Sequence, residues 1–342
     1  MERQKVVLAK ADAPSNIAIV KYWGKQAIQE PVNPSISFTL SRARTETKVS
    51  YTAVRKELKI DFLFEGKRKK AFIPKLEKLI QALLPRMPFL QSGELFIESS
   101  NTFPHSSGIA SSASAMAALV KGLYSIHQQL SQDDDSKMDA QKISAMARLG
   151  SGSACRSTLP GWVLWGETAE YASSSNLYGC SINELVHPLF LQLQDSILLI
   201  RSGAKSVSSS AGHALMKDHP YRQGRIQQAN KHTAELLRAL KMGDFTAFAG
   251  ICEAEALSLH GLMMSSSPPY TLMAPESLAA IETIRSFRLQ HNIPLTFTLD
   301  AGPNIHLIYP NEVKQEVLPF IEDCLKPLCE NKTVIYDELS IQ

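Results

Sequence analysis

Apolar and polar positions alternate along several stretches of this chain, and this period of two predicts β-strands. Apolar side chains occupy every second position in residues 36–40, 49–53 and 58–62, as expected for strands with one buried face. A hairpin is expected around Glu65 and Gly66, between residues 61–64 and 71–73. Further apolar runs predict strands at residues 5–10, 95–99, 191–200, 295–299, 305–309 and 334–336.

Elsewhere the apolar positions recur every three to four residues, which predicts helices. The clearest case is residues 113–124, whose first turn Ser111 or Ser112 can cap. Another helix is expected over residues 136–149, ended by Gly150 and capped by the acidic triplet before it, a triplet that otherwise resembles a metal site. The remaining helices are expected over residues 75–84, 222–241, 244–263 and 275–291.

The chain is long enough for two domains, because about 150 residues per domain is usual and the sequence has 342. Its texture changes near Leu189, where a buried strand pattern is followed by long helices. Strands and helices are grouped rather than strictly alternating, which is typical of α+β domains. We therefore predict an α+β fold with domains at residues 1–188 and 189–342.

Composition narrows the class of protein. Hydrophobic residues make up 44% and charged residues 20% of the chain, with a net charge of +3, as in ordinary globular proteins. The one tight basic cluster, residues 67–70, falls in the predicted hairpin turn, so no nucleic-acid surface is expected. No run approaches the roughly 20 apolar residues of a membrane span, so no membrane contact is expected either.

Cysteine and histidine usage argues against a protein-bound metal. The five cysteines are scattered without a Cys-x-x-Cys pair, and the nine histidines form no His-x-x-x-His pair. An odd number of dispersed cysteines is typical of a reducing compartment. We predict a cytoplasmic protein without a metal site built from its own side chains.

Small residues crowd residues 104–112, immediately before the helix that begins near Ser111. The unpaired N–H groups at a helix start, together with the helix dipole, attract anions. Gly108 and Ala110 leave room for a phosphate to approach the main chain. The segment lacks the Gly-Lys-Ser/Thr of a Walker A loop, so it is either a nucleotide-phosphate loop of another kind or a serine-rich helix cap.

Three other segments combine small, polar and charged residues in ways that a core does not require. In residues 16–25, Lys21 and Lys25 end an apolar strand and can hold phosphate oxygens, or they can be edge lysines that reach solvent. In residues 150–157, Arg156 can grip a carboxylate, or the segment can be a helix-ending turn. In residues 300–304, Asp300 can act as a base, or simply form a turn.

Together these segments resemble the GHMP kinase superfamily and, within it, the diphosphomevalonate decarboxylase family. The similarity runs in order through residues 16–25, 33–40, 104–114, 151–157, 266–269 and 298–304. The Lys-Tyr-Trp-Gly-Lys run at residues 21–25 and the Gly-Ser-Ala-Cys-Arg-Ser run at residues 152–157 are its most specific parts. The resemblance implies an N-terminal domain like ribosomal protein S5, a C-terminal ferredoxin-like domain and an active site between them.

The resemblance also implies a reaction and a set of site residues. ATP, with Mg²⁺, would phosphorylate the 3-hydroxyl of mevalonate 5-diphosphate, and loss of phosphate and CO₂ would give isopentenyl diphosphate. Asp300, Lys21 and Arg156 would be catalytic. The substrate would be bound by Ala18, Tyr22, Lys25, Ser151, Ser153, Ser209 and Gly212. ATP would be bound by Asn101, Pro104, Ser106, Ser107, Gly108, Ala110, Ser111 and Ser112.

One difference from the family pattern leaves open how many phosphates the substrate carries. Ser210 stands where members of the family carry an arginine that helps to bind the diphosphate. Lys205, Arg222 or Arg225 would have to compensate; otherwise the substrate carries one 5-phosphate. A kinase that stops after phosphorylation and a nucleotide-binding regulatory protein are further alternatives. The resemblance implies a homodimer.

Overall fold

The computed structural model describes residues 6–104, 109, 111–131, 139–203 and 207–341, apart from the side chain of Arg55. The strands of the N-terminal part are β1 Val6–Ala18, β2 Lys25–Gln26, β3 Glu30–Pro31, β4 Ser35–Glu57, β5 Lys59–Phe64, β6 Lys67–Arg68, β7 Ser92–Asn101, β8 Trp162–Trp165 and β9 Gly179–Ser181. The strands of the C-terminal part are β10 Leu193–Leu198, β11 Thr296–Thr298, β12 Ile305–Pro310 and β13 Val334–Glu338. The helices are α1 Ile73–Leu83, α2 Ser111–Leu130, α3 Ala140–Gly150, α4 Ser209–Leu215, α5 Arg222–Met242, α6 Phe245–Met264, α7 Pro275–His291 and α8 Lys314–Phe320.

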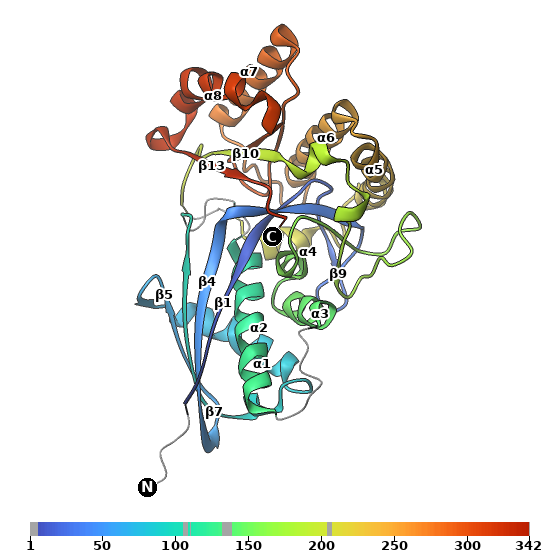
Figure 1. Cartoon of the computed structure of the whole chain (residues 1–342). Coiled ribbons are helices and arrows are strands. Elements are labelled where there is room, and N and C mark those ends of the chain that lie inside the picture. Colours follow the sequence, from blue (N-terminus) through green and yellow to red (C-terminus); the bar gives the residue numbers. More distant parts are fainter. Residues whose placement is uncertain (1–5, 105–108, 110, 132–138, 204–206, 342) are drawn as a thin grey trace.

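A seven-stranded sheet built around β4 organises the N-terminal part (Figure 1). Its order is β6-β5-β7-β4-β8-β9, and β1 also pairs antiparallel with β4. The register of β1 shifts between Pro14 and Asn16, since a proline cannot donate to a ladder and is accommodated at such a bulge. β1 therefore continues past the proline and delivers residues 16–18 to the site.

Helix α2 packs against β1 and β4 with α3 beside it, and α1 packs against α3 (Figure 1). Its buried face includes Met116, Leu119, Val120 and Leu123, the positions that the helical spacing indicates. These side chains join the apolar face of the sheet in one core. The start of α2 is thereby held firmly at one end of the sheet.

The C-terminal part is built on an antiparallel sheet in the order β11-β12-β10-β13. In Figure 1 this sheet and α5 to α8 occupy one end of the molecule, beyond the long strands β1 and β4. The chain leaves the seven-stranded sheet after Ser181 and enters the second sheet at Leu193. One hydrophobic core nevertheless contains residues of both parts, among them Ile17 and Ile197. The two-domain α+β fold is confirmed, while the limits 1–188 and 189–342 stay a prediction.

Most predicted elements are present, and the strand predicted at residues 71–73 is wrong. β5 forms its hairpin with Lys67 and Arg68, and α1 begins at Ile73 with Pro74 in its first turn. A proline suits that position because its missing N–H would have no partner there. The acidic triplet lies outside the described residues, and α3 is capped by Asp139, which accepts from Gln141 N at 2.9 Å.

Within the described residues, no helix combines the length and the apolar character that a membrane span requires. All five cysteines are free thiols, and only Cys324 among them is exposed.

Candidate active site

A cavity of about 320 Å³, the main cavity, lies where the end of β1, the start of α2, the end of α3 and the Asp300 turn meet. It gathers residues that are far apart in the sequence. The predicted site residues that line it are Ala18, Lys21, Tyr22, Lys25, Ser111, Ser112, Ser151, Ser153, Arg156, Ser209 and Asp300. The three predicted catalytic side chains therefore share one space.

Lys21 and Asp300 form an ion pair at the cavity wall. Lys21 Nζ lies 2.9 Å from Asp300 Oδ1 and donates a second hydrogen bond to the carbonyl of Ala18 at 2.7 Å. The Lys21 side chain is 2% exposed, whereas that of Asp300 is 26% exposed. The carboxylate is thus open to a ligand while the ammonium behind it is fixed.

Arg156 belongs to the helical turn Gly152–Thr158, which follows α3. The residue is 2% exposed, its NH1 donates to Ser35 Oγ, and its guanidinium carbon lies 5.7 Å from the centre of the Trp165 ring. Burial lowers the pKa of Arg156, although a guanidinium keeps its proton in proteins. Within the described part of the chain, its buried Nε has no hydrogen-bond partner, and the residue lines the main cavity.

Tyr22 presents a second unpaired group. Its buried hydroxyl has no partner within the described structure, and burial raises the pKa of Tyr22, so the group is a neutral hydroxyl. A Cβ at Gly152 would lie 2.6 Å from this oxygen, so glycine is required for the approach. A polar ligand would satisfy the Tyr22 hydroxyl, whose desolvation is otherwise uncompensated.

The charge of the main cavity is strongly positive. Among the described residues that line it, Asp300 is the only acid, whereas Lys21, Lys25, Lys75 and Arg156 are basic. Burial lowers the pKa of both Lys25 and Lys75, and the neighbouring charge of Lys75 lowers that of Lys25 further. Such a concentration of cations suits a ligand with several negative charges.

His213 completes this side of the main cavity as a neutral group. Burial, followed by the charge of Lys25, lowers the pKa of His213 to about 3. Its Nδ1 accepts a hydrogen bond from Gly24 N at 3.0 Å, and its ring packs against those of Tyr22 and Trp23. His213 therefore orients the segment of residues 22–24 and adds no positive charge to the main cavity.

The predicted ATP residues are only partly described. Ser111 and Ser112 are the first residues of α2, so neither is its N-cap, and both line the main cavity. They also line an adjoining, largely apolar cavity of about 70 Å³, the side cavity, together with Asn101, Lys75, Phe62, Phe64, Phe72 and Ile97. Among the described residues, the buried Asn101 Nδ2 has no hydrogen-bond partner. Ser106, Ser107, Gly108 and Ala110 lie outside the described residues, and Pro104 lines neither cavity.

Two of the residues named above lie away from the main cavity lining. Gly212 does not line the main cavity; it packs behind Trp23, where a Cβ would lie 2.6 Å from the indole ring. Arg225 cannot compensate for Ser210, because its guanidinium is bound to Glu255 at 2.7 Å and the residue is 3% exposed. Arg222 does not line the cavity either, and Lys205 lies outside the described residues.

Sequence reasoning missed Lys75, the basic residue that lines both cavities. A lysine in the first turn of an amphipathic helix resembles an ordinary solvated side chain, and no motif surrounds it. Ser210 itself lines the main cavity, and Lys25 and Lys75 are basic residues of the same lining.

A protein-bound metal finds no ligand set in the described ranges, since no group of three or more His, Cys, Asp or Glu side chains could hold an ion. Mg²⁺ is commonly held by one carboxylate together with substrate phosphates. Asp300 and the hydroxyls of Ser111 and Ser112 in the main cavity fit that arrangement. The site is thus compatible with Mg²⁺ brought in by a nucleotide.

Comparison with known proteins gives the family. Residues 13–178 match the diphosphomevalonate decarboxylase-like N-terminal domain, and residues 196–341 match the mevalonate 5-diphosphate decarboxylase C-terminal domain. The chain is 32% identical to the diphosphomevalonate decarboxylase of Aspergillus fumigatus, over 95% of this chain and 82% of the relative. The chain belongs to the diphosphomevalonate decarboxylase family. The Saccharomyces cerevisiae relative is also 32% identical, over 92% of this chain and 81% of its own.

Solved structures of the family share the fold. The mevalonate diphosphate decarboxylase of Staphylococcus aureus superposes with a TM-score of 0.84 at 28% identity, covering 98% of this chain and 96% of that one. A complex of the enzyme MDDEF with MVAPP, the ATP analogue AMPPCP and magnesium superposes with a TM-score of 0.82 at 28% identity, over 98% and 97% of the two chains. Family and fold thus agree with the resemblance found in the sequence motifs.

Proposed function

We propose that this protein uses ATP to phosphorylate the 3-hydroxyl of mevalonate 5-diphosphate and then releases phosphate and CO₂ to form isopentenyl diphosphate. The observation that carries the proposal is the main cavity, in which Asp300, the one acid among the described lining residues, pairs with Lys21 and shares the lining with three further basic side chains. Membership of the diphosphomevalonate decarboxylase family supports the same activity.

Asp300 is the group in position to act on the tertiary hydroxyl. Its carboxylate accepts or orients the hydroxyl proton while the oxygen attacks the γ-phosphorus of ATP, and ADP leaves. Lys21 Nζ, 2.9 Å from Asp300 Oδ1, holds the carboxylate in place and stabilises negative charge on the transferred group. The buried position of Lys21 fixes this charge before substrate arrives.

Arg156 holds the carboxylate that will be lost. Its unpaired Nε is a donor for a carboxylate oxygen. When the C3–O bond breaks, phosphate leaves with the bonding pair, and the electrons of the C–CO₂⁻ bond form the new double bond. Phosphorylation makes this step possible because phosphate is a far better leaving group than hydroxide, and Arg156 keeps the carboxylate aligned for it.

The basic wall and the unpaired hydroxyl of Tyr22 are suited to the 5-phosphates. Lys25 supplies charge there, and Ser151, Ser153 and Ser209 supply hydroxyl groups. The start of α2 takes the ATP phosphates with help from Lys75. The apolar side cavity takes the base, beside Asn101 Nδ2, which has no partner among the described residues. Mg²⁺, when bound, neutralises phosphate charge during the transfer.

Comparison of the 5-diphosphate with the 5-monophosphate tests the proposal. Because a charged hydrogen bond contributes about 1.5–3 kcal/mol, kcat/KM is expected to favour the diphosphate by roughly 10- to 100-fold. ADP and CO₂ are measured with each substrate. Lys25→Gln is expected to raise the KM for the diphosphate and narrow the preference. Equal or reversed selectivity in the wild-type protein would instead make it a phosphomevalonate decarboxylase.

We further propose a cytoplasmic homodimer. The free cysteines of this chain are compatible with a reducing compartment, and the dimer rests on the family resemblance. Light scattering on the purified protein is expected to give twice the mass of one 37.7 kDa chain; the mass of a single chain would refute the dimer.

A further inference from the structure

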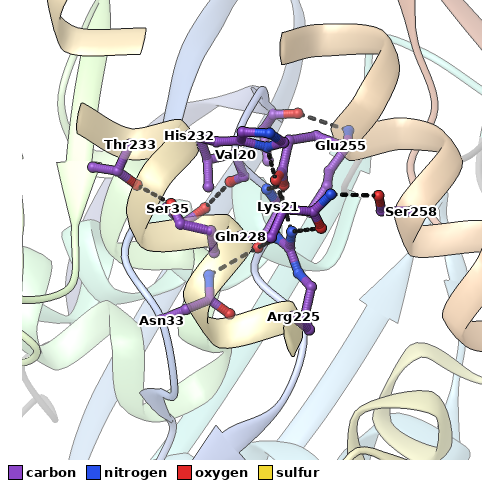
Figure 2. Close-up of polar contacts among 12 residues, drawn as sticks. Val20, Lys21, Asn33, Ser35, Arg225, Gln228, His232, Thr233, Glu255 and Ser258 are labelled. Atoms are coloured by element: carbon purple, nitrogen blue, oxygen red, sulfur yellow. Dashed lines mark hydrogen bonds and ion pairs between the residues drawn. The ribbon is translucent and has the colours of Figure 1, made fainter. Parts of the chain in front are cut away.

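The main chain of Lys21 is held by side chains from the C-terminal part of the protein (Figure 2). Glu255 Oε2, on α6, accepts a hydrogen bond from Lys21 N at 2.8 Å. Arg225, on α5, donates from NH2 to Lys21 O at 2.9 Å, and Asn33 Nδ2 donates to the same oxygen at 3.1 Å. Lys21 follows the end of β1 and lies outside any regular element, so these contacts hold a segment that no sheet ladder holds.

The residues that hold Lys21 form a closed, charged cluster. Arg225 makes two hydrogen bonds to Glu255, each of 2.7 Å, and His232 Nδ1 donates to Glu255 Oε1 at 2.6 Å. Glu255 is fully buried and Arg225 is 3% exposed. Burial raises the pKa of Glu255, but the His232 hydrogen bond and the charge of Arg225 outweigh it, so the pKa lies at about 2. Glu255 is therefore a carboxylate that three donors hold in place: the side chains of Arg225 and His232 and the main-chain N–H of Lys21.

Helix α6 also contacts Asp300, the ion-pair partner of Lys21. The carbonyl of Asp300 can only accept, so His260 Nε2 donates to it at 3.1 Å. Glu255 and His260 lie five residues apart on α6 and are both buried. One helix thus holds the main chain of Lys21 at one point and the main chain of Asp300 at another, while the two side chains meet at 2.9 Å.

We propose that Glu255, supported by Arg225, is a positioning residue that sets Lys21 against Asp300 for phosphoryl transfer. It touches neither substrate nor Asp300, and acts through the main chain of Lys21. The inference rests on the proposed function, because it assigns Lys21 and Asp300 to the phosphorylation step. A misplacement of about 1 Å in such a pair can cost on the order of 10²-fold in rate.

The same helix offers a matched control. Glu253 is also buried, at 7% exposure, and is paired with two arginines, Arg285 at 2.9 Å and Arg288. It lies two residues from Glu255, but within the described structure its carboxylate accepts from Arg285, Arg288 and Thr296 and not from Lys21. Glu253→Gln therefore removes a buried acid of the same kind without loosening Lys21.

The experiment compares Glu255→Gln, Arg225→Lys and Glu253→Gln with wild-type protein in a steady-state assay of ADP and CO₂, with thermal unfolding measured in parallel. Glu255→Gln and Arg225→Lys are expected to lower kcat by about 10- to 100-fold. The KM for ATP and the KM for mevalonate 5-diphosphate are each expected to change by less than about threefold, because the residues that contact these ligands remain. Arg225→Lys keeps a buried cation beside Glu255, so it decides the matter if Glu255→Gln fails to fold.

The inference is overturned if the fall in kcat in folded Glu255→Gln or Arg225→Lys is no larger than in Glu253→Gln. It is also overturned if the loss resides in KM alone, which would indicate a binding defect. Absence of turnover by the wild-type protein would refute the proposed function instead, so the two failures are distinguishable.

Discussion

Asp300→Asn is expected to lower kcat by about 10²–10⁴-fold, the contribution typical of a positioned general base. Asparagine has nearly the same shape and still offers an oxygen to Lys21 Nζ, which now lies 2.9 Å from the carboxylate, but it cannot take a proton. ADP and CO₂ are expected to disappear together, because phosphorylation of the hydroxyl precedes the loss of CO₂. Both are measured at saturating substrate.

Binding provides the control for this variant. The Asp300 side chain is 26% exposed at the cavity wall, so the substitution should leave the fold intact. Calorimetric titration with mevalonate 5-diphosphate should give nearly the wild-type affinity. If Asp300→Asn keeps more than about a tenth of the wild-type kcat, proton transfer by Asp300 is not part of the mechanism.

Lys21→Met is expected to lower kcat by about 10²–10³-fold, as for the loss of one preorganised group that stabilises developing charge. Methionine fills much of the space of the lysine stem but leaves Asp300 without its ammonium partner and the transferred phosphoryl group without this cation. The single-turnover rate of ADP formation measures the effect directly on the phosphorylation step.

A lysine elsewhere shows whether the effect is specific. Lys231 is exposed on α5 and pairs with Glu235 at 3.7 Å, and it is not among the described residues that line the main cavity. Lys231→Met should therefore retain wild-type kcat. A comparable loss in both variants, or none in Lys21→Met, would contradict the role given to Lys21.

The sequence patterns predicted the long helices well because each has a clear boundary signal. α7 begins and ends at the predicted residues 275 and 291, where Pro275 suits the first turn. α6 begins after Asp244, which caps it through Ala247 N at 3.0 Å. The short elements β8 and α4 went unpredicted: β8 is four buried residues, a length at which periodicity carries little information.

The site residues that lie in a sequence motif could be predicted. Those that only the fold brings to the site could not. Lys21, Arg156 and Asp300 each lie in a segment whose small and charged residues stand out, and they do line one cavity. Lys75 and Glu255 have no such signal, because a lysine or a glutamate on a helix usually faces water. Only the packing of α6 against the segment after β1 reveals that Glu255 is buried at the main chain of Lys21.

The positions of these residues also explain why the site needs both parts of the chain. Lys21 and Arg156 come from the part that carries the seven-stranded sheet, whereas Asp300 follows β11 of the other sheet. The two parts are connected by the hydrophobic core that contains Ile17 and Ile197. They are also connected by the hydrogen bonds of Glu255 and Arg225 to Lys21. Catalysis therefore depends on packing that no single motif encodes.

The most direct test of the central claim is the stoichiometry of the reaction. Purified protein is incubated with ATP, Mg²⁺ and mevalonate 5-diphosphate, and ADP and CO₂ are followed in the same sample. We predict equal amounts of ADP and CO₂, each matching the substrate consumed. ADP without CO₂ would identify a kinase. The absence of both products would contradict the proposed function.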